Sequence, residues 1–313
     1  MNESGAGLVA TIGDAASTCP RSLAGQEADV FQAGDDSSLR TMSTGIGPLL
    51  VLGAGQRCGS TLLQRLLSSH PDVHIWGEHA GQLTPLLAVA ARTKAWAARE
   101  GSWGRQEFAQ GGYQSFMANV TPEPGWVDEA GRRFISTLFG DPALAMGRKV
   151  WGFKEVRYGL PEAQAVRRLF PGTRVIHVVR DPRDVLRSLD AWERNEIAWP
   201  RYKTRAAVND WLRIAGSFLS CDETGMPVLC LRYEDIIRDP AATSLRIGEH
   251  TGLDPDLFDQ EVFACKIHSS VTERVDDREI RAWSELPESV RALLARDDLR
   301  RVASACGYHL YGS

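Results

Sequence analysis

The chain has 313 residues, of which 43% are hydrophobic and 24% are charged, and its formal net charge is −4. These values are typical of a soluble globular protein, and so small a negative charge excludes a general attraction to nucleic acid or to an anionic membrane. Any bound anion must therefore be held by a local cluster of basic side chains. We expect no membrane span, because no segment has the ~18 unbroken apolar residues of a membrane helix.

The six cysteines are scattered along the chain and form no C-x-x-C pair. This spacing predicts neither a disulfide framework nor a zinc site, and we expect no bound metal. The N-terminus lacks the basic start and apolar run of a secretory signal. Free thiols without such a signal indicate a cytoplasmic protein.

The N-terminal segment 1–46 is rich in Gly, Ser, Ala, Asp and Glu and has no apolar periodicity. It is predicted to be a flexible tail, followed by a single domain at 47–313. Met42 lies just before the first predicted strand, so the sequence leaves open whether 1–41 belong to the natural protein.

The first part of the domain begins with the apolar run 49–52, which predicts a strand buried on both faces. After a glycine-rich loop, leucines at helical spacing predict a helix over 61–69, and Pro71 ends it. A second strand is expected at 73–76 and a long helix at 82–99. The segment 100–144 is less regular and rich in aromatic residues, whose rings are expected in a core more often than in a cleft.

The rest of the domain alternates strands with helices. Strands are expected at 149–153, 174–179 and 227–231, and helices at 161–170, from Pro182 onward and at 204–222. The alternation predicts an α/β fold with a doubly wound parallel sheet flanked by helices. Charged residues follow each of the five strands directly, at the edge where ligands of such sheets bind.

The loop between the first strand and the first helix has the composition of a phosphate cradle. Its small residues let the backbone wrap an anion, and the helix that follows presents free N–H groups. It is of P-loop type without being a Walker A loop, because Gly59-Ser60 precede Thr61 where that motif has Gly-Lys. The cation is Arg57 instead. A glycine-rich turn without a ligand is the alternative interpretation.

Two segments resemble motifs of sulfotransferases that use 3′-phosphoadenosine-5′-phosphosulfate (PAPS). The run Arg57-Cys58-Gly59-Ser60-Thr61 resembles their 5′-phosphosulfate-binding loop. Arg180 and Ser188 have the spacing of eight that the family's 3′-phosphate motif shows. The resemblance implies PAPS as co-substrate, adenosine 3′,5′-bisphosphate as product and no metal. A salt bridge to Asp181 is the alternative role for Arg180, and a plain helix-face serine is the alternative for Ser188.

The stretch from Arg57 to Glu78 is most similar to the tyrosylprotein sulfotransferase branch of that family. That branch has Gly-Glu-Glu where this chain has Gly77-Glu78-His79. The match implies that Glu78 is the general base that takes the acceptor's proton. The histidine departs from the pattern, and His79 is a competing base because an unperturbed imidazole titrates near neutrality.

Lys154, one of five lysines, resembles the lysine that the family places after its third strand. The resemblance implies that it stabilises charge on the transferring group together with Arg57. The alternative is a solvated lysine paired with Glu155. The cytosolic branch of the family has a histidine base two residues further on, where this chain has Val156. That absence favours Glu78.

The C-terminal third resembles the family less closely. Tyr233-Glu234-Asp235 is similar to a Y-E-D segment whose tyrosine contacts the nucleotide, although a packing tyrosine is an equal alternative. Ser270 and Arg281 correspond loosely to residues that close over the nucleotide in the tyrosylprotein branch.

The sequence as a whole predicts a PAPS-dependent sulfotransferase that acts on an acceptor hydroxyl. A small molecule, a glycan, a lipid and a tyrosine side chain all remain open as acceptors, and the sequence gives no oligomeric state. The segment 100–144 is expected to vary with the acceptor, because it inserts between the Glu78 and Lys154 segments. The alternatives are a P-loop kinase or nucleotide switch that uses ATP or GTP, and a nucleotide-binding module without catalysis.

Overall fold

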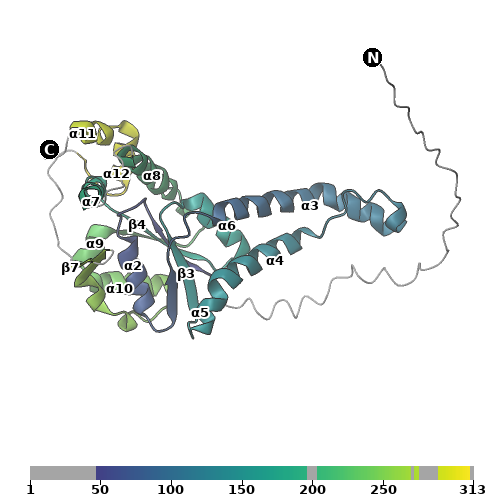
Figure 1. Ribbon diagram of the computed structural model, residues 1–313, viewed down its shortest axis with the longest axis horizontal. Coiled ribbons are helices and arrows are strands. Elements are labelled where there is room, and N and C mark those ends of the chain that lie inside the picture. Colours follow the sequence, from purple (N-terminus) through teal and green to yellow (C-terminus); the bar gives the residue numbers. More distant parts are fainter. Residues whose placement is uncertain (1–46, 196–202, 269–270, 275–287, 311–313) are drawn as a thin grey trace, which may run out of the picture. The chain divides into compact units, whose positions relative to one another are not determined.

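The computed structural model describes residues 47–195, 203–268, 271–274 and 288–310. A five-stranded sheet lies at its centre in the order β2-β3-β1-β4-β5, and all four pairings are parallel (Figure 1). The strands are β1 Leu49–Gly53, β2 Val73–Trp76, β3 Val150–Glu155, β4 Arg174–Val179 and β5 Val228–Arg232. The predicted doubly wound parallel sheet is confirmed.

Helices cover both faces of the sheet, and the alternation of side chains along β1 shows how. Leu50 and Leu52 pack against α3 (Leu83–Gly111), α4 (Pro124–Ile135), α6 and α8, whereas Leu49 and Val51 pack against α2, α9 and α10. Helices α7, α11 and α12 form a third cluster with α8. These helices are α2 Ser60–Ser69, α6 Leu160–Leu169, α7 Pro182–Asn195, α8 Lys203–Phe218, α9 Tyr233–Arg238, α10 Pro240–Thr251, α11 Glu288–Leu294 and α12 Asp297–Ala305.

The third strand is longer than its sequence pattern predicts. It was expected at 149–153, but β3 runs to Glu155, and Lys154 and Glu155 pair in register with Val51 and Leu52 of β1. Both charged side chains are buried, with Lys154 6% and Glu155 0% exposed. The sheet continues through them because each charged head meets an oppositely charged partner, as described below.

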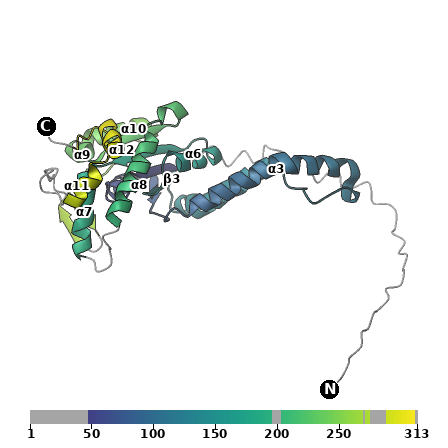
Figure 2. The same ribbon diagram turned by 90° about the horizontal axis from the view of Figure 1, so that it is seen from above.

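The segment 100–144 is helical, contrary to the prediction of a less regular region. Helix α3 extends over Leu83–Gly111, past the expected end at 99, and it packs along α4, Pro124–Ile135. The two helices lie side by side and lead away from the sheet as an arm (Figures 1 and 2). Short helical turns complete the segment: η2 Gly112–Gln114, the π-helical turn η3 Ser136–Gly140 and α5 Asp141–Ala145.

Two glycines explain why α3 continues. A Cβ on Gly101 would lie 2.0 Å from Thr121 Oγ1, and one on Gly104 would lie 2.5 Å from the carbonyl oxygen of Asn119. These glycines therefore permit close packing inside the arm rather than ending the helix. With Ala97 they form the buried face of α3 along this stretch.

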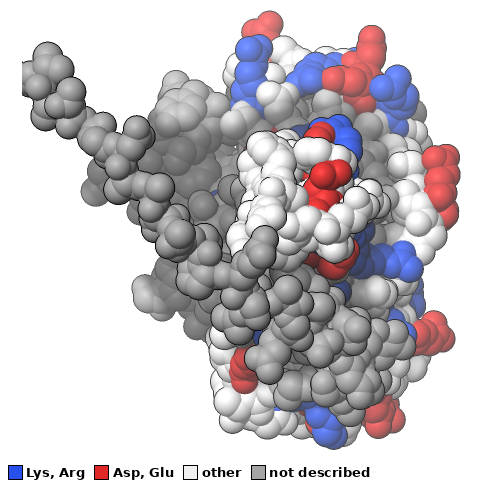
Figure 3. Space-filling view, turned by 90° about the vertical axis from the view of Figure 1, so that its right-hand side faces the viewer, with Lys and Arg blue, Asp and Glu red and all other residues white. Residues whose placement is uncertain are grey.

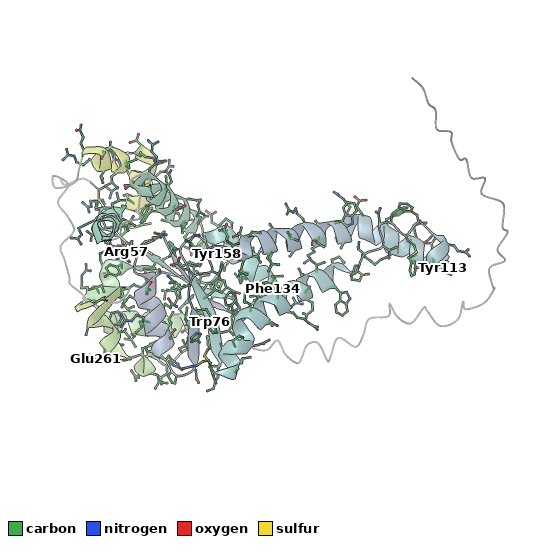
Figure 4. All side chains as sticks on the ribbon, in the orientation of Figure 1. Arg57, Trp76, Tyr113, Phe134, Tyr158 and Glu261 are labelled. Carbon is green, nitrogen blue, oxygen red and sulfur yellow. The ribbon has the colours of Figure 1, made fainter. Side chains whose placement is uncertain are left out.

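The prediction that the aromatic rings of this segment belong to a core is wrong for most of them. Small residues fill the inner face of α3, and Trp96 and Trp103 are 47% and 45% exposed. Tyr113, at the far end of the arm in Figure 4, is 73% exposed. The large apolar side chains of the arm that are exposed are Val89, Trp96, Trp103, Tyr113, Phe116, Met117, Trp126, Phe134 and Leu138.

Most of the remaining described elements lie between α10 and α11. Two short strands, β6 Cys265–His268 and β7 Val271–Arg274, form an antiparallel pair. They follow the turns η5 Pro255–Leu257 and η6 Gln260–Phe263, and η4 Asp222–Thr224 precedes β5. Within the described ranges, no helix combines the length and apolar character needed to cross a membrane.

Candidate active site

The loop after β1 is held in a shape that only particular residues allow. Gly59 has a φ of 96°, and a Cβ there would lie 2.2 Å from the ring of Tyr233. Arg57 has a φ of 65°, which is uncommon for a residue with a side chain. The buried Cys58 donates through Sγ to the carbonyl oxygen of Gly55 at 3.1 Å, and burial raises the pKa of its thiol. The side chain of Cys58 is therefore part of the packing beneath the loop.

Helix α2 begins directly behind this loop. Its N-terminus has no side-chain cap and no acidic residue in the first turn. Backbone N–H groups at such a helix start favour an anion, and the helix dipole adds to that preference. Ser60 is buried at this position and Thr61 follows it. The geometry is that of the predicted phosphate cradle.

Two arginines that follow different strands, Arg57 in the loop and Arg180 after β4, lie together at this edge of the sheet. Arg57 donates from Nε to Ser188 Oγ at 2.9 Å, and Arg180 donates from Nη1 to the carbonyl oxygen of Arg57 at 3.3 Å. Burial and the charge of Arg180 together lower the pKa of Arg57. Two guanidinium groups this close favour a bound anion, which relieves their repulsion. Arg57, Arg180 and Ser188 thus lie together, as the sequence predicts.

Arg180 is fixed from several sides and still has an unused donor. Its backbone carbonyl accepts from Trp211 Nε1 at 3.0 Å, and its side chain lies 3.8 Å from Asp184. Its buried Nε has no hydrogen-bond partner among the described residues. A buried guanidinium N–H is costly to leave unpaired, so Arg180 has one donor left for a further acceptor. The alternative pairing with Asp181 is not seen, since Asp181 binds Arg183 at 2.7 Å.

Tyr233 contacts the loop and Arg180. Its ring packs against Gly59, and the guanidinium of Arg180 lies 4.2 Å from the ring centroid. Glu234, the next residue, accepts from the backbone N–H of Asp181 and from the hydroxyl of Tyr308, at 3.0 and 2.6 Å. The Y-E-D segment thus braces the end of β4. These contacts support the packing role of Tyr233, and its contact with a nucleotide stays a prediction.

Lys154 joins the loop to Glu78. Its Nζ lies 2.5 Å from Glu78 Oε1 and 3.5 Å from Thr61 Oγ1. Burial would raise the pKa of Glu78, but hydrogen bonds and charges from Lys154 and Arg157 outweigh it and hold the pKa below its usual value. Glu78 is therefore a carboxylate at neutral pH. The alternative pairing of Lys154 with Glu155 is not observed.

His79 is turned into a cluster of rings. It lies 4.9 Å from Phe153, 5.3 Å from Tyr158 and 5.9 Å from Phe139, measured between ring centroids. Burial lowers its pKa, so the imidazole is neutral. Between the two candidate bases, only Glu78 contacts Lys154.

One functional candidate, Arg157, has no counterpart in the sequence prediction. Its Nη1 lies 2.9 Å from Glu78 Oε2 and 2.9 Å from Glu155 Oε1. Its position, directly after β3 on the edge that carries Lys154, is the signal that identifies it in the sequence. Two predicted residues, Ser270 and Arg281, lie outside the described residues.

Figure 3, which looks at the molecule from the end of the arm, shows acidic and basic side chains intermingled on the surface, which agrees with the small net charge. Figure 4 places Arg57 beside the end of the sheet. Within the part of the chain that the structure describes, no group of three or more His, Cys, Asp or Glu is arranged to hold a metal ion.

A sequence model of the sulfotransferase family matches residues 48–257, more than half of the chain. The chain belongs to the sulfotransferase family. The match covers the loop, Glu78, Lys154, Arg180 and Ser188.

Curated relatives place this sulfotransferase near the tyrosylprotein branch. It is 23% identical over 255 residues to protein-tyrosine sulfotransferase A of Caenorhabditis elegans, covering 79% of this chain and 60% of that protein. It is 25% identical over 259 residues to protein-tyrosine sulfotransferase 1 of Danio rerio, covering 79% of this chain and 64% of the relative. The chain thus spans under two thirds of the length of either relative. The predicted resemblance to this branch is confirmed.

A solved structure supports the fold. The sulfotransferase domain from the curacin biosynthetic pathway matches with a TM-score of 0.52 and 16% identity, covering 86% of this chain and 100% of that domain. At this identity the likeness concerns the fold alone. The alternatives of a kinase and of a nucleotide switch are not favoured by any of these matches.

Proposed function

We propose that this sulfotransferase takes its sulfuryl group from PAPS and transfers it to an acceptor hydroxyl. The convergence of Arg57, Arg180 and Ser188 carries the proposal. One cluster joins the loop after β1 to the strand end that resembles the 3′-phosphate motif. A donor with a phosphosulfate at one end and a 3′-phosphate at the other matches two basic groups placed in this way.

The fit of PAPS to the site is supported by two features of the chain. The loop and the start of α2 offer backbone N–H groups for the 5′-phosphosulfate. The unpartnered Nε of Arg180 offers a donor for the 3′-phosphate, and Ser188, which binds Arg57, offers its hydroxyl. PAPS supplies an activated sulfuryl group with a good leaving phosphate, so no metal is required of the protein.

The chain's own residues perform the remaining steps. Glu78 Oε1 accepts the proton of the acceptor hydroxyl as the oxygen attacks. Lys154, now 2.5 Å from that carboxylate and 3.5 Å from Thr61, is placed to move its charge toward the transferring group. Arg57 and Lys154 then stabilise the negative charge that develops there.

The acceptor is a hydroxyl on a small molecule, a glycan, a lipid or a protein tyrosine. The experiment that tests the proposal is incubation with sulfur-labelled PAPS and a panel that contains one acceptor of each class. Labelled product on any acceptor, with equal release of adenosine 3′,5′-bisphosphate, supports it. Sulfuryl transfer from a different donor, such as an aryl sulfate, with no use of PAPS refutes it.

Arg180→Ala is expected to weaken binding of adenosine 3′,5′-bisphosphate about 10- to 100-fold, the range for lost hydrogen bonds to a charged group. Binding of adenosine 5′-monophosphate should change little, because it lacks the 3′-phosphate. Calorimetric titration of both nucleotides measures the difference. Arg133→Ala is the control, since Arg133 pairs with Glu129 on α4. An equal loss of affinity for both nucleotides would mean that Arg180 acts on the 5′-phosphate, which both share, and not on the 3′-phosphate.

A further inference from the structure

A fully buried carboxylate fixes the segment that carries Glu78. Glu155, the last residue of β3, is 0% exposed. Its Oε2 accepts from the backbone N–H of Gly81 at 2.8 Å, and its Oε1 accepts from that of Val156 at 2.9 Å. The turn at Gly81 is left-handed, as is Ala80 before it, with φ of 72° and 55°. One side chain thus ties this turn to the strand that carries Lys154.

Arg157 extends this link to Glu78 itself. Its Nη1 donates to Glu155 Oε1 and to Glu78 Oε2, both at 2.9 Å. Its backbone carbonyl accepts from Nη2 of Arg213, on α8, at 2.9 Å. The arginine is therefore held at both ends. Since Lys154 binds Oε1 of Glu78, the two oxygens of this carboxylate have separate cationic partners.

We propose that Arg157 is a positioning residue for Glu78, anchored by Glu155. This inference rests on the function proposed above. Arg157 keeps Oε2 in place when Lys154 moves toward the transferring group. Oε1 is then free to accept the acceptor's proton, and the carboxylate does not rotate away. While Arg157 holds Oε2, the orientation of the Glu78 carboxylate stays fixed and Oε1 points toward the acceptor. General base catalysis depends on such a fixed geometry.

The charges around Glu78 give the proposal a measurable consequence. The groups that face it are Lys154 and Arg157, which are cationic, and Glu155 and His79. Arg157 contributes to holding the pKa of Glu78 below its usual value. Removing this cation must raise that pKa. The base is then protonated over a wider range at low pH, so the acid limb of the rate profile moves to higher pH.

The variant Arg157→Gln in the full chain tests the inference. Carbon-13 labelling of glutamate carboxyls, with Glu78→Gln for assignment, measures the titration of Glu78 without any acceptor. We expect its pKa to rise by about one unit, the lower end of the effect of a neighbouring opposite charge. With an acceptor, kcat should fall about tenfold, and KM for PAPS should not change. The acid limb of the rate profile should move to higher pH by about the same one unit as the pKa of Glu78. Arg157→Lys keeps the positive charge, so the pKa of Glu78 should return most of the way to its wild-type value. It should restore less of kcat, because an ammonium group does not hold the carboxylate in the fixed geometry of a planar guanidinium.

Arg133→Gln is the matched control, because Arg133 also binds a glutamate at 2.7 Å but lies on α4. It should change neither the titration of Glu78 nor kcat. An unshifted titration and acid limb in Arg157→Gln would overturn the inference, and so would a loss of thermal stability that accounts for all of the lost activity. If the wild-type protein uses no PAPS while the titration shifts, the proposed donor fails and the role of Arg157 toward Glu78 stands.

Discussion

Replacing Lys154 by alanine is expected to lower kcat by about 10²- to 10³-fold, the usual effect of removing one group that stabilises charge in the transition state. The physical reason is its position. Its ammonium lies between Glu78 and Thr61, and Lys154 as a whole is only 6% exposed, so water does not take the place of the charge. Steady-state kinetics with PAPS and the best acceptor of the panel measure the loss.

Lys149→Ala is the control for this variant. Lys149 lies just before β3, at the end opposite to Lys154, and forms an exposed ion pair with Asp72 at 3.0 Å. Such pairs contribute little, so kcat should stay near the wild-type value. Binding of adenosine 3′,5′-bisphosphate should remain measurable in both variants. Unchanged turnover in Lys154→Ala would contradict the role assigned to this lysine.

Replacing Glu78 by glutamine should lower kcat by about 10²- to 10⁴-fold, the range for a general base. The amide keeps the shape of the side chain but cannot take a proton. The affinity for adenosine 3′,5′-bisphosphate should change little, because no contact joins Glu78 to Arg57 or Arg180 among the described residues. Kinetics and calorimetry on the same preparation separate the two effects.

Replacing His79, the competing base, shows which of the two residues takes the proton. His79→Phe places a ring among Phe139, Phe153 and Tyr158, where the imidazole packs now. If Glu78 is the base, His79→Phe keeps most of the activity while Glu78→Gln loses it. The reverse pattern would assign the base to His79. Glu129→Gln, which removes an ion-pair partner on the arm, controls for a general effect of losing a carboxylate.

The sheet and the donor loop are predictable from the sequence because their signals are local. A continuous apolar run such as 49–52 has few alternatives to a strand buried on both faces, and the expected bounds of β2 and β4 agree with the structure. The loop is equally clear, since Gly59 is required by its φ of 96° and by the ring of Tyr233.

The arm is not predictable in the same way. Gly101 and Gly104 are ordinary signals for the end of a helix, yet here they allow contact with Asn119 and Thr121. That contact depends on tertiary structure. The role of Arg157 toward Glu78 is hidden for a related reason, because Glu78 comes near Arg157 only when β2 and β3 pair.

Calorimetric titration with adenosine 3′,5′-bisphosphate in the presence of a chelator tests the central claim most directly. The site formed by Arg57, Arg180, Ser188 and the start of α2 predicts saturable binding without metal, in competition with PAPS. It also predicts that ATP with Mg²⁺ binds more weakly, because the loop lacks the lysine of triphosphate sites. Binding of ATP that requires Mg²⁺, with none of adenosine 3′,5′-bisphosphate, would contradict the account.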